Sequence, residues 1–257
     1  MNRTLHTCVF ALSAAVLILA LTCSAAFAGP MVAARPRDPI SRIATLNWSG
    51  YAVETSLAAP QTGSVSDVVG TWQVPFVTGS SNAWSSAWIG IDGYSSASVE
   101  QIGTDQDTSR RGAHYYAWYE MYPGASHNIT SLAVNPGNVI TAEVRYVGSN
   151  QYVLKISNTS AGGSFQTTQT LSASRTSAEW IMEAPSSGNS VLPLANFGTA
   201  NFSACNATLN GVAGPIGQWA YDPITMVGGS SRRSYTKATP SALTGGGTAF
   251  SVTWSHQ

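Results

Sequence analysis

The sequence has few charged residues. Only 9% of its 257 residues are charged, and 12 Lys and Arg balance 12 Asp and Glu, so the formal net charge is zero. Two of the basic residues are lysines, Lys155 and Lys237. Such a balance leaves no basic surface of the kind that binds nucleic acid. A surface of Ser, Thr, Asn and Gln also changes its charge little when carboxylates are protonated, which suits an acidic environment.

Long apolar runs are absent after the first residues of the chain. Arg3 precedes an apolar stretch over 9–21, and small residues follow at 26–28. This pattern predicts a signal peptide over residues 1–28. Nothing later offers the roughly 20 consecutive apolar residues that a membrane helix needs. We therefore expect a secreted, extracellular protein that does not associate with membranes, with the periplasm as the alternative location.

Cysteine is scarce. Of the three cysteines, Cys8 and Cys23 lie within the predicted signal peptide, so Cys205 has no partner in the mature chain. No internal disulfide is expected, and stability must come from the core of a single large domain. We interpret Cys205 as a small buried hydrophobic residue.

Several common catalytic motifs are missing. The sequence has no His-Glu-x-x-His zinc helix, no Gly-x-Ser-x-Gly elbow, no P-loop and no Gly-rich dinucleotide turn. Only His114, His127 and His256 lie outside the predicted signal peptide. A Ser-His-Asp triad stays open, because its members can be scattered along a chain, but no local pattern supports it.

Short strand patterns fill the chain after residue 45. Residues 29–45 are rich in Pro and Arg and predict a short pro-segment or disordered lead, and 46–257 read as one β-domain. The clearest feature is a hairpin of 139–147 with 152–157, turning at 148–150. Further strands are predicted at 65–74, 87–92, 115–122, 178–183, 198–204 and 249–254. The fold class is therefore all-β, a sandwich of two antiparallel sheets of the concanavalin-like type.

Strand alternation places several acids among aromatic residues. Side chains two residues apart share a face of a strand. In 88–92, Trp88 and Asp92 share one face. In 114–122, one face carries Tyr116, Trp118 and Glu120. Polar groups interleaved with Trp and Tyr indicate a substrate groove, although a solvated sheet face that happens to carry acids is the alternative.

Glu179 and Glu183 share a face of their predicted strand. They are four residues apart, or about 13 Å along an extended chain. The two carboxyl groups cannot act on one atom. At most one is the catalytic acid or base, and the other has a supporting role.

These same segments resemble the eqolisins, the glutamic peptidase family. The matching blocks occur in the family's order at 47–52 (NWSGYA), 87–93 (AWIGIDG), 101–105 (QIGTD), 116–123 (YAWYEMYP), 178–183 (AEWIME) and 194–198 (LANFG). The resemblance implies two packed antiparallel sheets and endopeptidase activity on polypeptides in acid. It also implies that no metal or organic cofactor is needed, and we expect a monomer.

The resemblance further implies a catalytic dyad of Gln101 and Glu183. Trp88, Asp92, Asp105 and Glu120 match family positions that surround and orient this dyad. Three neighbouring carboxyl groups cannot all ionise cheaply, so we expect activity to be lost near neutral pH.

One residue departs from the family pattern. Glu100 stands where better-known members have an apolar residue, and alternation places it on the face opposite Gln101.

Two other functions compete with the peptidase. A glycoside hydrolase would use Glu120 and Glu183 across an aromatic groove. A secreted lectin-like binding module would hold a ligand with the same aromatic residues while its acids stay idle.

Overall fold

The computed structural model describes residues 36–257 except residues 38, 42, 80, 231 and 232. The predicted signal peptide over 1–28 lies outside the described residues. Within the described part, no helix is long and apolar enough to cross a membrane.

Two layers of antiparallel strands make up the molecule, and they confirm the predicted all-β sandwich. The first sheet runs in the order β17 (Ala220–Ser230), β3 (Trp48–Glu54), β12 (Ser177–Glu183), β5 (Ser86–Ile91), β6 (Val99–Ser109), β7 (Gly112–Tyr122) and β8 (His127–Ile129). The second sheet runs in the order β11 (Ser164–Thr170), β10 (Gln151–Asn158), β9 (Val139–Gly148), β4 (Val65–Gln73), β15 (Thr199–Leu209), β19 (Phe250–Trp254) and β18 (Arg233–Pro240).

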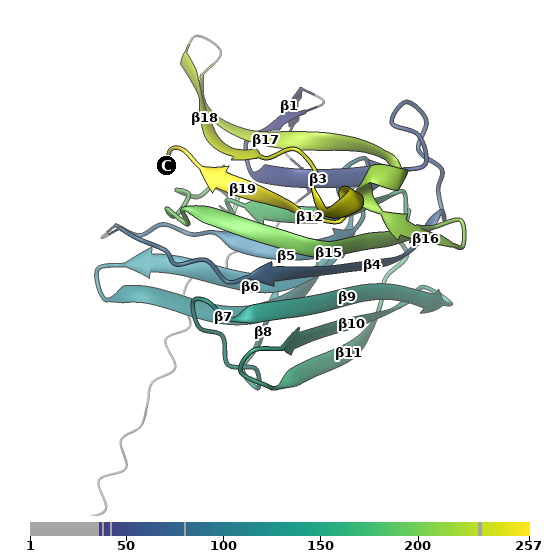
Figure 1. Ribbon diagram of the computed structural model, residues 1–257, viewed down its shortest axis with the longest axis horizontal. Helices are drawn as coiled ribbons and strands as arrows, with labels where there is room; N and C mark the ends of the chain where they lie inside the picture. The colour runs from purple at the N-terminus through teal and green to yellow at the C-terminus, as the bar shows by residue number, and fades with distance from the viewer. Residues whose placement is uncertain (1–35, 38, 42, 80, 231–232) are drawn as a thin grey trace, which may run out of the picture.

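β17 joins the two sheets. Residues 220–224 pair with β3, and residues 226–230 pair with β18. In Figure 1, β5 and β12 of the first sheet lie partly behind β4 and β15 of the second. The remaining elements are β1 (Pro39–Ser41), β2 (Ala44–Thr45), β13 (Ser186–Ser187), β14 (Ser190–Val191), β16 (Val212–Pro215) and two 3-10 turns at Ile216–Gln218 and Gly245–Gly247.

The predicted hairpin is confirmed as β9 and β10. Ser149 and Asn150 connect them with φ of 52° and 58°, the left-handed values that a tight hairpin turn uses. The other predicted strands correspond to β4, β5, β7, β12, β15 and β19, with ends that differ by a few residues.

The main core lies between the two sheets. Trp180 of β12 and Trp72 of β4 are fully buried there, and each indole N–H has a partner. Trp180 Nε1 donates to the Val69 carbonyl at 2.8 Å, and Trp72 Nε1 donates to Thr104 Oγ1 at 2.9 Å. Cys205 is also fully buried in this core, as its interpretation as a small hydrophobic residue requires.

The predicted lead over 29–45 is ordered where the structure describes it. β1 pairs with β2, and β2 pairs in parallel with β17. This part of the lead therefore extends the second sheet instead of standing apart from it.

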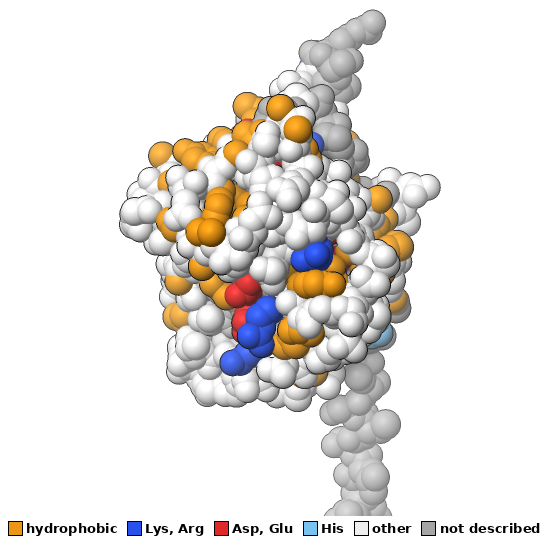
Figure 2. Space-filling view, turned by 90° about the vertical axis from the view of Figure 1, so that its right-hand side faces the viewer, with side chains coloured by type: hydrophobic (Ala, Val, Ile, Leu, Met, Phe, Trp, Pro, Cys, Tyr) orange, Lys and Arg blue, Asp and Glu red, His pale blue; other side chains and the backbone are white. Residues whose placement is uncertain are grey.

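Charge is sparse on the surface that Figure 2 displays. That face is mostly uncharged, with a small cluster of acidic and basic side chains and a few separate basic ones. On the second sheet, Arg145 and Glu143 form an ion pair at 3.5 Å.

Candidate active site

The register of the first sheet places Gln101 and Glu183 on the same side. Glu183 of β12 opposes Ser86 of β5, and Ser86 opposes Asp105 of β6. Directly opposed residues point to one side of a sheet, and so do residues two apart on a strand. Gln101 lies four residues before Asp105, so it shares that side with Glu183.

This side is the outer face of the first sheet, turned away from the main core. A smaller apolar cluster covers it. Its members are Trp48, Ala52, Trp88, Tyr94, Val99, Trp118, Ile181 and Ile224, with Tyr116 and Tyr122 packed against them. Acids and aromatic residues are thus interleaved on one face, as the alternation of the sequence predicts.

Glu183 is held by two N–H donors, one from β5 and one from the residue that precedes β3. Trp88 Nε1 donates to Glu183 Oε2 at 2.8 Å, and Asn47 Nδ2 donates to Oε1 at 3.3 Å. Trp88 in turn meets Trp48 edge to face, with ring centroids 4.9 Å apart. The carboxyl group of Glu183 therefore has a fixed orientation.

Gly103 makes room for Trp88. It opposes Trp88 across β5 and β6. A Cβ at residue 103 would lie 2.5 Å from Trp88 Cβ and 2.5 Å from the Ala87 carbonyl oxygen, closer than real Cβ contacts. Only glycine lets β5 and β6 pair here with the indole in place.

Gln101 is paired with Glu120. The two residues oppose each other on β6 and β7, and Gln101 Nε2 donates to Glu120 Oε2 at 3.3 Å. Both side chains are fully buried, as is that of Glu183. Glu120 thus sets which way the Gln101 amide points.

Asp105 lies level with Glu183 across β5. It accepts hydrogen bonds from Ser86 Oγ and, at 2.7 Å, from the Tyr116 hydroxyl. Burial raises the pKa of Asp105 to about 6, although these hydrogen bonds act in the opposite direction. Two residues further on, burial and the nearby charge of Asp105 raise the pKa of Asp107 to about 9. Both groups are neutral in acid.

Glu179 stands on the outer face, in line with Gln101. It opposes Gly90, which opposes Gln101. Burial, together with the charges of Asp92, Glu54 and Glu100, raises the pKa of Glu179 well above its ordinary value. Glu179 is therefore a neutral carboxylic acid at low pH.

Asp92 has a different location from the other predicted site residues. It follows β5 with a φ of 72° and accepts bonds from the backbone N–H groups of Arg175 at 2.6 Å and Thr176 at 2.8 Å. The Thr176 hydroxyl adds a third bond at 3.0 Å. Asp92 therefore anchors the segment that enters β12, and no contact described here joins it to Glu183.

Glu100 lies on the side opposite Gln101, as predicted from alternation. This side faces the core, and Glu100 is fully buried. Burial, followed by the charge of Asp92, raises the pKa of Glu100 well above its ordinary value. Its charge is thus removed by protonation in acid.

Sequence reasoning missed three residues of this face. Asn47 belongs to a matched block, but nothing in the sequence shows that it reaches Glu183. Trp48 follows it, and its ring contacts Trp88. Trp84 continues the alternation of Ser86 and Trp88, and this period-2 signal would have identified it.

Among the residues that the structure describes, no group of three or more His, Cys, Asp or Glu could hold a metal ion.

Comparisons with known proteins identify relatives of this chain. Residues 46–250 match the model of the Peptidase A4 family. Aspergillopepsin-2 from Aspergillus niger is 32% identical over 133 residues, which are 49% of this chain and 46% of that protein. Scytalidopepsin B from Scytalidium lignicola is 30% identical over 177 residues, which are 64% of each chain. The chain thus spans about half to two thirds of the length of these relatives.

A solved structure has the same fold. The crystal structure of scytalido-glutamic peptidase with a transition state analog inhibitor superposes with a TM-score of 0.69 at 24% identity. The match covers 81% of this chain and 98% of that one.

Proposed function

Because this chain belongs to the Peptidase A4 family, the eqolisins, we propose that it is an endopeptidase that hydrolyses polypeptides in acid with Gln101 and Glu183. The family resemblance predicted from six sequence blocks is thereby confirmed. The observation that supports the proposal is that Gln101 and Glu183 lie on the same face of the first sheet, each held by its own partner. Gln101 is level with Glu179 and Glu183 is level with Asp105, so the two residues are about 13 Å apart along the strands and the scissile bond would lie between their side chains.

Glu183 acts as the general base in this proposal. A carboxylate only accepts hydrogen bonds, and Trp88 and Asn47 both present N–H donors to it. Ionised Glu183 takes a proton from a water molecule as the water oxygen bonds to the scissile carbonyl carbon. It then gives that proton to the departing nitrogen as the carbon–nitrogen bond breaks. Such proton transfer contributes about 10² to 10⁴ in rate.

Gln101 stabilises the oxyanion that forms on the carbonyl oxygen. Its amide nitrogen carries two N–H groups, and the bond to Glu120 orients the amide. One preorganised donor of this kind contributes on the order of 10² to 10³ in rate.

Acid activity is supported by the carboxyl groups around the dyad. Asp105, Asp107 and Glu179 have raised pKa values, so they are neutral in acid and ionise as the pH rises. Asp105, with a pKa of about 6, ionises below neutral pH and would place a negative charge level with Glu183, whereas Asp107, with a pKa of about 9, stays protonated there. We therefore expect activity to fall towards neutral pH.

Residues 36–37 lie at the rim of the site, where a substrate would enter. Asn47 Nδ2 donates to the Pro36 carbonyl at 3.4 Å, and the Arg37 guanidinium lies 3.9 Å from the centre of the Tyr94 ring. Residues 36–37 thus lie against the site. We infer that this part of the lead is displaced or cleaved before a polypeptide binds, after export directed by residues 1–28.

The test is digestion of a denatured protein between pH 3 and pH 7, after preincubation in acid with N-terminal sequencing of the enzyme. We expect Glu183→Gln to lose about 10² to 10⁴ in rate and Gln101→Ala about 10² to 10³. Glu143→Gln, on the second sheet, is the matched control and should keep the parent rate. Pepstatin should not inhibit, as the family resemblance implies. The assignment is overturned if either dyad variant digests the substrate as fast as the parent. It is also overturned if the parent protein shows no activity after its lead has been removed.

A further inference from the structure

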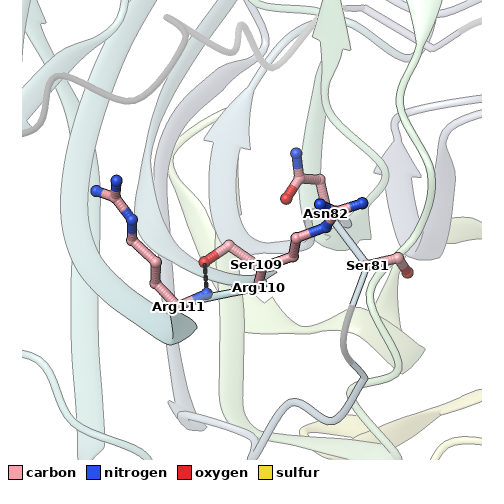
Figure 3. A pocket seen from close by; sticks show the side chains of 5 residues that line it. All are labelled: Ser81, Asn82, Ser109, Arg110 and Arg111. Atoms are coloured by element: carbon pink, nitrogen blue, oxygen red, sulfur yellow. Dashed lines mark hydrogen bonds between the residues drawn. The ribbon is translucent and has the colours of Figure 1, made fainter.

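A surface cleft lies at the turn between β6 and β7. It has a volume of about 470 Å³ and is lined by Ser81, Asn82, Ser109, Arg110 and Arg111 (Figure 3). Neither arginine belongs to the proposed dyad or its partners. In a chain with 12 basic residues, two consecutive arginines at one cleft are a local concentration of positive charge.

The floor of this cleft continues the outer face of the first sheet. Ala83 and Thr108 exchange backbone hydrogen bonds of 3.1 and 2.8 Å, so these residues oppose each other. Asn82 therefore stands opposite Ser109. Ser109 lies eight residues beyond Gln101 on β6, an even number, so it shares the side of the dyad.

A continuous row of side chains connects the cleft with Glu183. The row begins at Asp105, which lies level with Glu183, and passes Trp84 and Asp107 before it reaches Ser109. Four residues separate Asp105 from Ser109, or about 13 Å along the strand. An extended polypeptide advances by about 3.3 Å per residue, so a bound chain covers this distance in about four residues.

The turn that carries the arginines has a fixed shape. Ser109 Oγ accepts a hydrogen bond from the Arg111 N–H at 3.1 Å and donates one to the Gly112 carbonyl at 3.1 Å. Figure 3 shows the Arg110 side chain extending towards Asn82, whereas the Arg111 side chain extends the other way. Arg110 and the Asn82 amide thus offer N–H donors to one region of the cleft.

In acid, the carboxyl groups that the structure describes near the cleft bring no negative charge to Arg110. Asp107 and Asp105 face this end of the row, and burial raises both pKa values, so neither is charged at low pH. His114, opposite Asp107 on β7, is exposed and carries no negative charge at any pH. Guanidinium groups stay charged throughout this range.

We propose that this cleft is a specificity subsite that takes an acidic side chain of the polypeptide substrate about four residues from the scissile bond, with Arg110 as its counter-ion. The inference rests on the proposed peptidase function and adds a substrate preference to it. An exposed charge pair of this kind contributes about two- to fivefold in kcat/KM at low ionic strength and is screened by salt.

The test uses a set of peptides with one bond that the protein cleaves. At each position from three to five residues on either side of that bond, the set carries Gln, Glu or cysteic acid. At pH 5 and low salt we expect kcat/KM to be about two- to fivefold higher for Glu than for Gln at one position. At pH 3 this preference should disappear for Glu, whose ordinary pKa is about 4.3, and persist for cysteic acid, which stays ionised.

Arg110→Gln should bring the acidic-to-neutral ratio to one. Arg145→Gln removes the same charge from β9 of the second sheet and should leave the ratio unchanged. Two results would overturn the subsite and leave the peptidase function intact. One is that the parent cleaves the Gln, Glu and cysteic acid peptides equally at every position. The other is that Arg110→Gln keeps the acidic-to-neutral ratio of the parent. If the parent cleaves no peptide, the peptidase function fails. Fluorescence anisotropy then measures peptide binding, and equal affinity for acidic and neutral peptides overturns the subsite as well.

Discussion

Asp105 is a buried carboxyl group that links the stability of the fold to pH. It is 3% exposed, and burial raises its pKa from 3.8 to about 6. The folded protein therefore holds the proton of Asp105 more tightly than the unfolded chain. Where the folded state binds more protons, the free energy of unfolding falls as the pH rises. The stabilisation from protonated Asp105 is complete below about pH 4 and is lost as the pH rises through about 6.

The magnitude follows from the same two values. The difference between 3.8 and about 6 corresponds to about 3 kcal/mol, at about 1.36 kcal/mol per pH unit. Asp105→Asn keeps a neutral group of the same shape. Ser86 and Tyr116 bond to different oxygens of Asp105, so the Asn carbonyl oxygen accepts from one hydroxyl and the Asn NH2 group donates to the other. The variant should therefore resemble the parent at pH 4 and be more stable than it by up to about 3 kcal/mol at pH 7.

Urea unfolding between pH 3 and pH 7.5 measures this difference directly. The comparison of variant with parent removes the contributions of the titrating groups that do not interact with Asp105. Asp107 is the exception, because the charge of Asp105 raises its pKa in the parent and not in the variant. Asp67→Asn is the matched control, because the pKa of Asp67 is also raised to about 6, by burial and by Glu143, on the second sheet. It should reduce the pH dependence of stability to a smaller extent, because Asp67 is only partly buried and solvent screens its charge, and it should leave the pH profile of proteolysis unchanged. A constant difference between Asp105→Asn and the parent across this range would refute the reasoning.

Two further substitutions test how Glu183 is held. Trp88→Phe removes the N–H that is bonded to Glu183 at 2.8 Å, so kcat should fall about 10- to 100-fold. Trp180→Phe removes an N–H that is bonded to Val69 in the core, so it should lower stability and leave kcat of the folded protein unchanged. Equal kcat values in the two variants would contradict this role of Trp88. Gly103→Ala should lower the free energy of unfolding by about 1 to 3 kcal/mol, measured by urea titration, because the new Cβ would lie 2.5 Å from the backbone of β5. An unchanged urea midpoint would contradict this steric argument.

The strands with alternating apolar residues could be predicted from the sequence, and those without could not. β9 and β10 alternate clearly and have a Ser-Asn turn. β6 was recognised only through its matched motif, because most of its side chains are polar. It is nevertheless buried on both sides, since its acids and amides face the site on one side and the core on the other. Burial without apolar residues leaves no periodic signal.

β17 was missed for a different reason. Pro223 and the pair Gly228–Gly229 argue against a strand, because proline cannot donate to a ladder. The structure accommodates Pro223 where β17 forms the edge of the first sheet, opposite Tyr51 of β3. Whether a strand lies at an edge depends on the whole topology, which a local pattern does not contain.

The candidate site shows the same division. Alternation on single strands groups Tyr116 with Trp118 and Glu120, and the register brings this group beside Gln101. The contact of Asn47 with Glu183 joins residues 136 positions apart, so only the folded chain reveals it. Alternation predicts that Asp92 shares the strand face of Trp88. However, Asp92 itself has a left-handed backbone conformation directly after β5, and its carboxyl group binds the Arg175 segment instead.

The buried acids give a common physical basis for these features. Glu54, Asp92, Glu100 and Glu179 are all buried in a chain with only 12 acidic residues. Asp92 is stabilised by three hydrogen bonds, whereas burial and neighbouring charges favour the neutral forms of Glu100 and Glu179. Protonation in acid removes the cost of burying these two groups, and the sparse surface charge keeps self-repulsion low at the same pH. The upper pH limit of such a fold is therefore set by the ionisation of its interior carboxyl groups and not by its net charge, which is zero at neutral pH.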